Sequence, residues 1–350
     1  LVLVFEGITS YGYTKRIWRH VRYGSGHVLV QPPGFLTKRT LDKVLPDPAE
    51  ILAKAKTLPG VEHATVRVQG FGLLSSGAKS SSINLVGTVP AVEPTASTIA
   101  SERKRIAGDY LRIRDQLPHP SDPGDVYVGK RLADSLDLGV GDRVVITVTP
   151  RGSDATNSAA FLVRGIFQTK VKAVDGYRVE VDIDEARALY GLEEAATQVA
   201  LVLRDGRDSN AIRARLIDML AGRMDVQVIT WEQAIPIIKE TAAFENSVLG
   251  MLMSIILLIA AVGIFNTQLM SIVERTREFG VMRAIGTSPW KMSTIILFET
   301  LILAGLFIGL GAAAGYGLHH LIVAKGIDPT VFYGKDIEVA GLVIEDRIRS

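Results

Sequence analysis

The sequence contains one near match to a nucleotide-binding loop, at residues 124–131 (GDVYVGKR). Such loops follow the pattern G-x-x-x-x-G-K-S/T, in which backbone amides surround the phosphates and the final hydroxyl binds Mg²⁺. Arg131 replaces that hydroxyl residue here, and the DVYV segment between the glycines is typical of a strand. We therefore predict that this chain binds no nucleotide and cannot hydrolyse ATP by itself.

The other residues with catalytic or metal-binding side chains form no recognisable site. None of the six histidines belongs to a metal-binding motif, and the absence of cysteine excludes disulfides and cysteine-bound metals. The histidines are His20, His27, His63, His119, His319 and His320. We interpret Asp182, Asp184 and Glu185, at a predicted strand-to-helix turn, as a helix cap and a solvated face. We predict no catalytic residue, no metal and no cofactor bound by this chain.

One carboxylate, Glu299, is isolated within a long apolar run. Ionisable groups inside membrane helices are energetically unfavourable and often functional. Because Glu299 lies about one turn from the end of its run, it can reach the membrane interface or a neighbouring helix. Three interpretations stay open, namely packing or anchoring, coupling to a partner, and proton relay.

The composition indicates a protein made of two unlike parts. The chain has 350 residues, of which 39 are Lys or Arg and 37 are Asp or Glu, so the formal net charge is +2. That near balance argues against a nucleic-acid partner, which would require a basic excess. Hydrophobic residues make up 47% of the chain, which is high for a soluble protein, yet 22% of the residues are charged.

Two long apolar runs lie in the last third of the chain, at residues 248–270 and 295–323. A helix needs about 20 apolar residues to cross a bilayer, so both runs are predicted membrane helices. The alternative is a pair of core helices in a large soluble domain. Leu1–Phe5 (LVLVF) is predicted to be the end of a further membrane helix, because the chain begins without Met and within an apolar pattern. The alternative is a short core strand.

The segment between the two runs, residues 271–294, is rich in basic residues. Short loops rich in Lys and Arg stay in the cytoplasm, so we predict that this loop is cytoplasmic. The regions before residue 248 and after residue 323 are then outside. Residues 6–244 would form one large extracytoplasmic domain.

That domain has the pattern of a mixed α/β fold with an insertion. Predicted helices cover Ala49–Leu58 and Asp208–Leu220, and predicted strands cover Val61–Val68, Ser82–Val89, Gln198–Leu203 and Asp225–Thr230. The insertion, at about 91–191, has predicted strands at Arg143–Thr149, Phe161–Phe167 and Arg178–Ile183. The polar segment between the first two of these strands is either a plain connection or a contact loop for a partner or cargo.

The last apolar run carries glycines at spacings of four. Gly305 with Gly309, and Gly311 with Gly315, form small-x-x-x-small pairs that allow close helix packing. We predict that this helix packs tightly against another helix, in the same protomer or in a second one.

The cytoplasmic loop resembles a known family signature. Residues 274–286 (ERTREFGVMRAIG) resemble the R-x-x-E-x-G-x-x-R-A-x-G signature of ABC transporter permeases of the MacB/FtsX/LolC–LolE superfamily. Further segments resemble those of the lipoprotein-releasing LolC/LolE-type permeases. They are residues 128–133 followed by 138–144, Gly165–Phe167 before Tyr177–Ile183, and residues 24–27. The resemblance covers nearly the whole chain.

The resemblance implies a membrane α-helical fold of four helices with a large α+β periplasmic domain. The first helix would be represented here by its end only, and no fourth helix follows Val323. The implied parts are 1–23 (end of the first membrane helix and a connecting helix), 24–90 with 192–235 (porter-like α/β subdomain), 91–191 (inserted β-rich subdomain), 236–273 (second membrane helix), 274–293 (cytoplasmic coupling loop), 294–324 (third membrane helix) and 325–350 (outer loop).

The resemblance also implies partners and a place in the cell. The partners would be a cytoplasmic ABC ATPase that holds ATP and Mg²⁺, a second permease protomer in a homo- or heterodimer, membrane lipid, and a periplasmic chaperone or adaptor. Residues 149–160 lie where one lipoprotein-releasing permease has a chaperone-binding hook, but the segment is shorter and lacks Met. The protein would be a multi-pass protein of the bacterial inner (cytoplasmic) membrane.

We expect residues 287–292 (TSPWKM) to dock on the ATPase. Ser288 can cap a short helix that has Pro289 at its first position, and Trp290 can fill an apolar pocket on the partner. The predicted coupling residues are Arg275, Arg277, Glu278, Arg283, Thr287, Ser288, Pro289, Trp290, Lys291 and Met292. The alternative is a loop that only contacts lipid headgroups.

Two functions stay open at this point. The first is ATP-driven extraction or export of a hydrophobic cargo, such as a lipoprotein, a lipid or an amphipathic drug, by mechanical transmission to the periplasmic domain. The second is an FtsX-like regulator that uses the same motion to activate a cell-wall hydrolase. The large outer domain favours the transporter.

Overall fold

The computed structural model describes residues 21–36, 41–116, 119, 122–234, 236–325, 338–339 and 342–343. These residues divide into two compact units. The α/β unit contains the described residues up to Ile238 together with two paired strands of two residues each, β11 (Glu338–Val339) and β12 (Leu342–Val343). The helical unit contains the described residues from Lys239 to Lys325.

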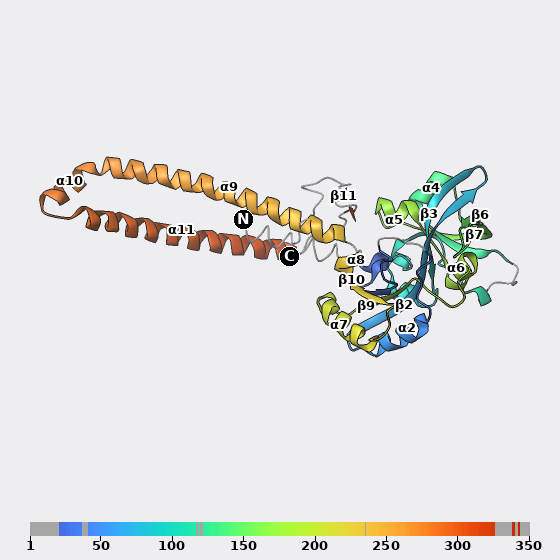
Figure 1. The fold of residues 1–350 in the computed structure, drawn as a ribbon. Coiled ribbons are helices and arrows are strands. Elements are labelled where there is room, and N and C mark those ends of the chain that lie inside the picture. The colour runs from blue at the N-terminus through green and yellow to red at the C-terminus, as the bar shows by residue number, and fades with distance from the viewer. Residues whose placement is uncertain are drawn as a thin grey trace. The chain divides into compact units, whose positions relative to one another are not determined.

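Four antiparallel strands form the first sheet of the α/β unit, in the order β10 (Gln227–Thr230), β1 (Val28–Gln31), β9 (Gln198–Leu203) and β2 (Val61–Ser76). Helices α2 (Pro48–Thr57) and α7 (Ser209–Met219) pack on this sheet and on each other (Figure 1). Ile51 and Ala55 of α2, and Ile212 and Leu216 of α7, are buried at a spacing of four residues. This spacing places one apolar stripe of each helix against the sheet.

The second sheet is a closed ring of strands, which we call the barrel. Among the described residues, the pairing runs β2, β3 (Lys79–Thr88), β8 (Arg178–Asp182), β5 (Gly124–Gly129), β7 (Asn157–Phe167), β6 (Arg143–Val148) and back to β2. Strand β4 (Arg105–Gly108) extends the edge of β7. Alternate side chains fill the interior, as in other small barrels. They include Val68, Leu74, Ile83, Leu85, Val126, Val128, Val144, Ile146, Phe161, Val163, Val179 and Val181.

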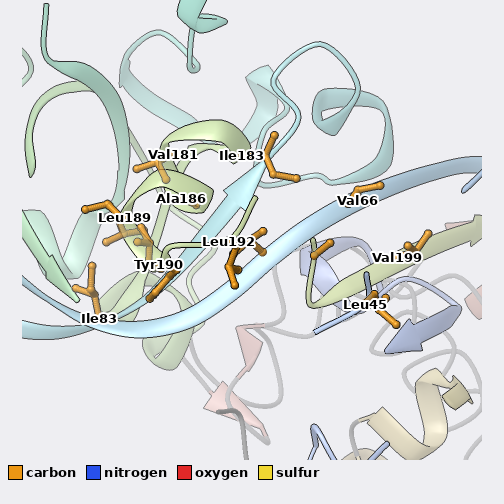
Figure 2. Packing of buried hydrophobic residues seen from close by; sticks show 14 of the residues in the cluster. Leu45, Val66, Ile83, Val181, Ile183, Ala186, Leu189, Tyr190, Leu192 and Val199 are labelled. Atoms are coloured by element: carbon orange, nitrogen blue, oxygen red, sulfur yellow. The ribbon is translucent and has the colours of Figure 1, made fainter. Parts of the chain in front are cut away.

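Helix α6 (Ile183–Tyr190) packs against β2, β3, β7 and β8. Figure 2 shows Ala186, Leu189 and Tyr190 of this helix close to Ile83 and Val181 of the barrel. Gly87 allows this approach, because a Cβ there would lie 2.4 Å from the Cβ of Ala186. The helix is therefore part of the barrel core.

The remaining elements are short. They are η1 (Val21–Ser25), α3 (Glu93–Ala96), η2 (Glu102–Lys104), η3 (Arg114–Gln116), α4 (Lys130–Leu136), α5 (Lys172–Tyr177), η4 (Gly206–Asp208) and α8 (Trp231–Ala234).

The predicted helices and strands of the outer domain are confirmed, with three differences. The strand predicted at 61–68 continues to Ser76 as β2, so the two sheets share one strand, whereas the predicted insertion began only at residue 91. The glycines at positions 70 and 72 weakened the strand pattern. They are needed because a Cβ would lie 2.7 Å from the Tyr190 ring and 2.9 Å from a Val148 methyl group. The sequence pattern could not show these contacts, which come from distant segments.

The other two differences concern the insertion. The polar segment predicted as a loop through residue 160 is shorter, because β7 begins at Asn157 and pairs with β6 from there. Glu185 was interpreted as part of a solvated face, but its side chain is 14% exposed and forms an ion pair with Arg114. Asp182 does cap α6, since its carboxylate accepts a hydrogen bond from the Asp184 amide at 2.9 Å.

The helical unit consists of α9 (Pro236–Glu274) from Lys239 onward, α10 (Thr276–Ala284) and α11 (Pro289–Lys325) (Figure 1). Within it, Asn246–Glu274 and Pro289–Leu318 are long and apolar enough to cross a membrane, and neither span is buried inside the structure. Leu257, Phe265 and Leu306 are 69%, 69% and 55% exposed. The alternative that these runs are core helices of a soluble domain is therefore wrong.

Candidate functional site

The connection between α9 and α11 contains the short helix α10, a loop and the first turn of α11, and we call it the α10 turn (residues 275–292). Helix α10 ends where Gly286 adopts a φ of 95°, a backbone conformation that favours glycine. The amide of Thr287 then donates to the carbonyl of Met282 at 3.0 Å. This closure of the helix end is a glycine C-cap, so the sequence stops α10 at this position.

Helix α11 begins as the sequence predicts. The hydroxyl of Ser288 accepts a hydrogen bond from the amide of Lys291 at 3.4 Å, and Pro289 occupies the first helical position. The predicted short helix at 287–292 is instead the first turn of α11, which continues without a break to Lys325. The hydroxyls of Ser293 and Thr294 donate to the carbonyls of Pro289 and Trp290 one turn earlier, so both polar side chains are accommodated within the helix. The separate short helix of the turn is α10.

Arg275 links the elements of the turn. Its Nε donates to Glu278 Oε2 at 2.9 Å, and its Nη1 lies 3.1 Å from Glu299 Oε2 on α11. Its guanidinium also lies 5.7 Å from the centre of the Phe279 ring. Both carboxylates are exposed, so each pair adds little stability in water, and its main effect is to orient the turn. Glu299 thus has a partner on the turn, as an anchoring role requires.

The rest of the α10 turn carries exposed apolar side chains together with exposed basic side chains. Trp290 is 82% exposed and Ile285 is 78% exposed. Arg277, Arg283 and Lys291 are exposed on the same turn, whereas Thr287 and Met292 are half-buried. An exposed indole among cations is typical of a contact surface for a protein with an apolar pocket and an acidic rim.

The glycines of α11 have open surroundings. A Cβ added at Gly305, Gly309, Gly311 or Gly315 would meet no atom of the described chain within 4 Å. These positions therefore leave room for another helix, and the predicted helix packing stays a prediction.

The sequence patterns that suggested other chemistry have structural explanations. Gly124–Gly129 is the buried strand β5, and the Lys130 amine pairs with Asp134 in α4 rather than facing a phosphate site. A Cβ on Gly129 would lie 2.4 Å from the Asp175 carbonyl oxygen, so this backbone is closely covered. Among the described residues no group of His, Asp or Glu side chains could hold a metal ion. His20 lies outside the described residues.

Sequence reasoning missed the contacts within the turn. The Arg275–Phe279 contact has a local signal, since the two residues are four apart on successive turns. The Arg275–Glu299 pair joins residues 24 apart and has no such signal. The coupling role of these residues stays a prediction.

Comparison with known proteins identifies the family. A family model described as the MacB-like periplasmic core domain matches residues 9–219, and one described as the FtsX-like permease C-terminal matches residues 250–343. The chain belongs to the MacB/FtsX/LolC superfamily of ABC transporter permeases. This confirms the family predicted from the 274–286 signature, and with the two apolar helices it indicates a membrane protein.

Individual relatives agree with this assignment. The lipoprotein-releasing system transmembrane protein LolC of Neisseria meningitidis serogroup B is 25% identical over 285 residues, which cover 79% of this chain and 64% of that protein. The macrolide export ATP-binding/permease protein MacB of Nitrobacter winogradskyi is 30% identical over 212 residues, 55% of this chain and 32% of that protein. This permease chain therefore spans less than two thirds of the length of either relative.

The periplasmic region of MacB from Actinobacillus actinomycetemcomitans superimposes with a TM-score of 0.43 at 12% identity, covering 64% of this chain and 98% of that one.

Proposed function

We propose that this permease is the transmembrane subunit of a transporter in which a separate ATPase drives the extraction or export of a hydrophobic cargo. The observation that carries the proposal is the α10 turn, where the exposed Trp290 stands among basic residues at the end of two membrane spans. Such a turn offers an ATPase a rigid contact. ATP and Mg²⁺ would be bound by that partner.

Helix α9 has the dimensions of a lever. At 1.5 Å per residue its 39 residues extend about 58 Å, roughly twice the hydrocarbon thickness of a bilayer. Its sequence has no proline after Pro236, so no kink is expected along it. Because the Asn246–Glu274 span accounts for only part of the helix, its first ten residues can carry motion beyond the membrane.

The topology follows from the charges of the turn. Arg275, Arg277 and Arg283 favour a cytoplasmic location, which supports our proposal that the spans lie in the inner membrane and the α/β unit in the periplasm. The open glycine positions on α11 would be covered by a second permease protomer or by the first or fourth helix of the four-helix permease type. No polar solute path is needed, since the spans are apolar and the work is mechanical.

Co-purification tests the proposal. The full protein is isolated from native membranes, and bound proteins and lipids are identified by mass spectrometry. We expect an ABC ATPase in the wild-type preparation and its loss in the Trp290→Ala/Pro289→Ala variant. Phe307→Ala, which truncates an exposed aromatic side chain in mid-span, is the matched control and should keep the ATPase.

The cargo is tested in the same preparation. A bound lipoprotein or lipid, released when ATP is added, supports transport. Recovery of a cell-wall hydrolase with no lipid or lipoprotein cargo would instead favour the FtsX-like regulator. An unchanged amount of ATPase and unchanged ATP turnover in the Trp290→Ala/Pro289→Ala variant would contradict the coupling role of the turn.

A further inference from the structure

Four charged side chains are buried inside the α/β unit. Arg67 on β2 and Glu93 on α3 have side chains 2% and 0% exposed, and Arg178 and Glu180 on β8 have side chains 11% and 0% exposed. Two cations and two carboxylates balance, so the group is neutral as a whole. Burying charges is unfavourable unless each one is paired and hydrogen-bonded, so such a group requires an explanation.

The hydrogen bonds of the group are directional and nearly complete. Arg67 Nη2 donates to Glu93 Oε1 at 2.6 Å, and Arg67 Nε donates to the same oxygen at 3.0 Å. Arg178 Nε donates to Glu180 Oε1 at 2.7 Å, and the hydroxyl of Tyr110 donates to Glu180 Oε2 at 2.9 Å. Burial alone would lower the pKa of Arg67, but the Glu93 carboxylate outweighs it and the pKa lies above its usual value.

The group also holds the short turn Val21–Ser25, which we call the neck. Arg67 Nη1 donates to the carbonyl of Gly24. Gly24 has a φ of 142°, and a Cβ there would lie 2.6 Å from Arg178 Nη1, so the neck lies directly against the second ion pair. The adjacent Tyr23 is buried in a separate apolar cluster with Ile99, Leu111, Tyr127, Phe167 and Val171.

Arg67 lies at the point where β2 passes from the four-stranded sheet into the barrel. Arg67 is the last residue of β2 that pairs with β9, and Val68 is the first that pairs with β3. The network therefore connects three parts, namely the four-stranded sheet, the barrel and the neck. Helix α8, which precedes α9, also contacts the neck, and the Trp231 amide donates to the His27 carbonyl at 3.0 Å.

We propose that this buried network is a rigid joint that makes the neck, the four-stranded sheet and the barrel move as one body. Apolar contacts are non-directional and allow packed parts to slide, whereas charge-assisted hydrogen bonds hold a fixed geometry. The use of the joint, transmission of motion from the membrane helices to the barrel, rests on the proposed function. Its rigidity is a property of the chain alone.

The absence of cysteine makes a direct test simple. Cysteines are introduced at Asn210 on α7 and at Ser82 on β3, both exposed, and carry nitroxide labels in the full chain in lipid nanodiscs. Pulsed electron paramagnetic resonance then gives the distribution of distances between the sheet and the barrel. We expect one narrow distribution for the wild-type network.

The decisive variant is Arg67→Met/Glu93→Leu, which removes the central pair and nearly keeps its volume. Apolar replacements of buried pairs are often neutral for stability, so we expect a melting temperature close to wild type together with loss of the narrow distribution. The control is Arg112→Met/Asp125→Leu. It removes a bidentate ion pair elsewhere in the α/β unit, at strand β5 of the barrel, and should leave the distribution of sheet-to-barrel distances narrow. A folded Arg67→Met/Glu93→Leu variant with a narrow distribution overturns the proposal.

Two further results also bear on the proposal, namely a variant that does not fold and a preparation without an ATPase. If the Arg67→Met/Glu93→Leu variant does not fold, Arg67→Lys decides, because it keeps the positive charge beside Glu93 but removes the guanidinium that bonds both Glu93 and the Gly24 carbonyl. Broadening in Arg67→Lys supports the joint, and an unchanged narrow distribution refutes it. These distances need no ATPase, so a failure to recover an ATPase contradicts the proposed function and leaves the joint intact.

Discussion

The α/β unit and the helical unit use the same apolar residue types in opposite ways. In the α/β unit every residue of β5 and of β9 is buried. In the helical unit, large apolar side chains such as Phe265 and Leu306 are exposed all around the helices. Helices that are apolar on every side and not covered by protein belong in lipid. The difference teaches that the arrangement of apolar residues, and not their number, separates a water-soluble core from a membrane span.

The two units also differ in how far their charged side chains are buried. The α/β unit buries Arg67 and Glu93 completely, whereas Arg275 and Glu299 in the α10 turn are 41% and 50% exposed. A buried pair depends on its partner, and an exposed pair can be exchanged for water or for another protein. Charges therefore hold structure in one unit and stay available for contact in the other.

The largest expected difference comes from the charge pairs. Glu93→Gln leaves Arg67 buried without its counter-ion and should lower the unfolding free energy of the α/β unit by about 3–5 kcal/mol. Glu299→Gln in the exposed pair should cost at most about 1 kcal/mol. Hydrogen exchange of the β9 amides measures the first effect, and exchange of the α10 amides measures the second. Equal effects would break the comparison.

Truncation of an aromatic side chain should lower the unfolding free energy much more in the α/β unit than in the helical unit. Phe161 fills the barrel interior, so Phe161→Ala should destabilise the α/β unit by about 3–5 kcal/mol through lost burial and a cavity. Phe307→Ala removes a side chain that is 66% exposed and leaves no cavity, so a change of only about 0.5 kcal/mol is expected. Chemical denaturation of the full chain in nanodiscs, followed by hydrogen exchange, gives both values. A large loss for Phe307→Ala would show that α11 has a buried face.

Alkaline pH should affect the α/β unit. Burial raises the pKa of Tyr127 and Tyr190 above the usual value of 10.0. The unfolded state then loses these protons first, so the stability they contribute is complete below about pH 10 and falls as the pH rises, by about 1.4 kcal/mol per pH unit for each tyrosine. Thermal melts of the full chain from pH 8 to 11 measure this slope. Tyr190→Phe should reduce the slope, and an unchanged slope would contradict the assignment.

The smallest effects are expected at two helix caps, one in each unit. Asp182 caps α6 and Ser288 caps α11. Replacing either residue with Ala should cost about 0.5–2 kcal/mol in the helix it starts. The Asp182→Ala cost should appear in the barrel amides, and the Ser288→Ala cost only in the first turn of α11. Hydrogen exchange resolved by peptide distinguishes them, and spread of the Ser288→Ala effect along the whole of α11 would disagree.

Local structure was predictable because its causes lie close together in the sequence. The strand-like apolar segment at 198–203 predicted β9 with both ends correct, and Ser288 with Pro289 predicted the start of a helix. The family signature at 274–286 lies within one short segment for the same reason. The end of β2 was not predictable, since Gly70 and Gly72 look like strand breakers until Tyr190 and Val148 are placed beside them.

From the sequence alone we predicted the two apolar spans, the basic turn between them, the family, most strands of the α/β unit and its helices α2 and α7, because periodicity, caps and charge runs act over a few residues. Only the tertiary structure decided that β6 closes the barrel onto β2, that Arg275 reaches Glu299, and that Arg67, Glu93 and Glu180 meet beside the neck. These contacts join residues 24 or more apart, and they depend on the strand register and chain path that the whole core selects.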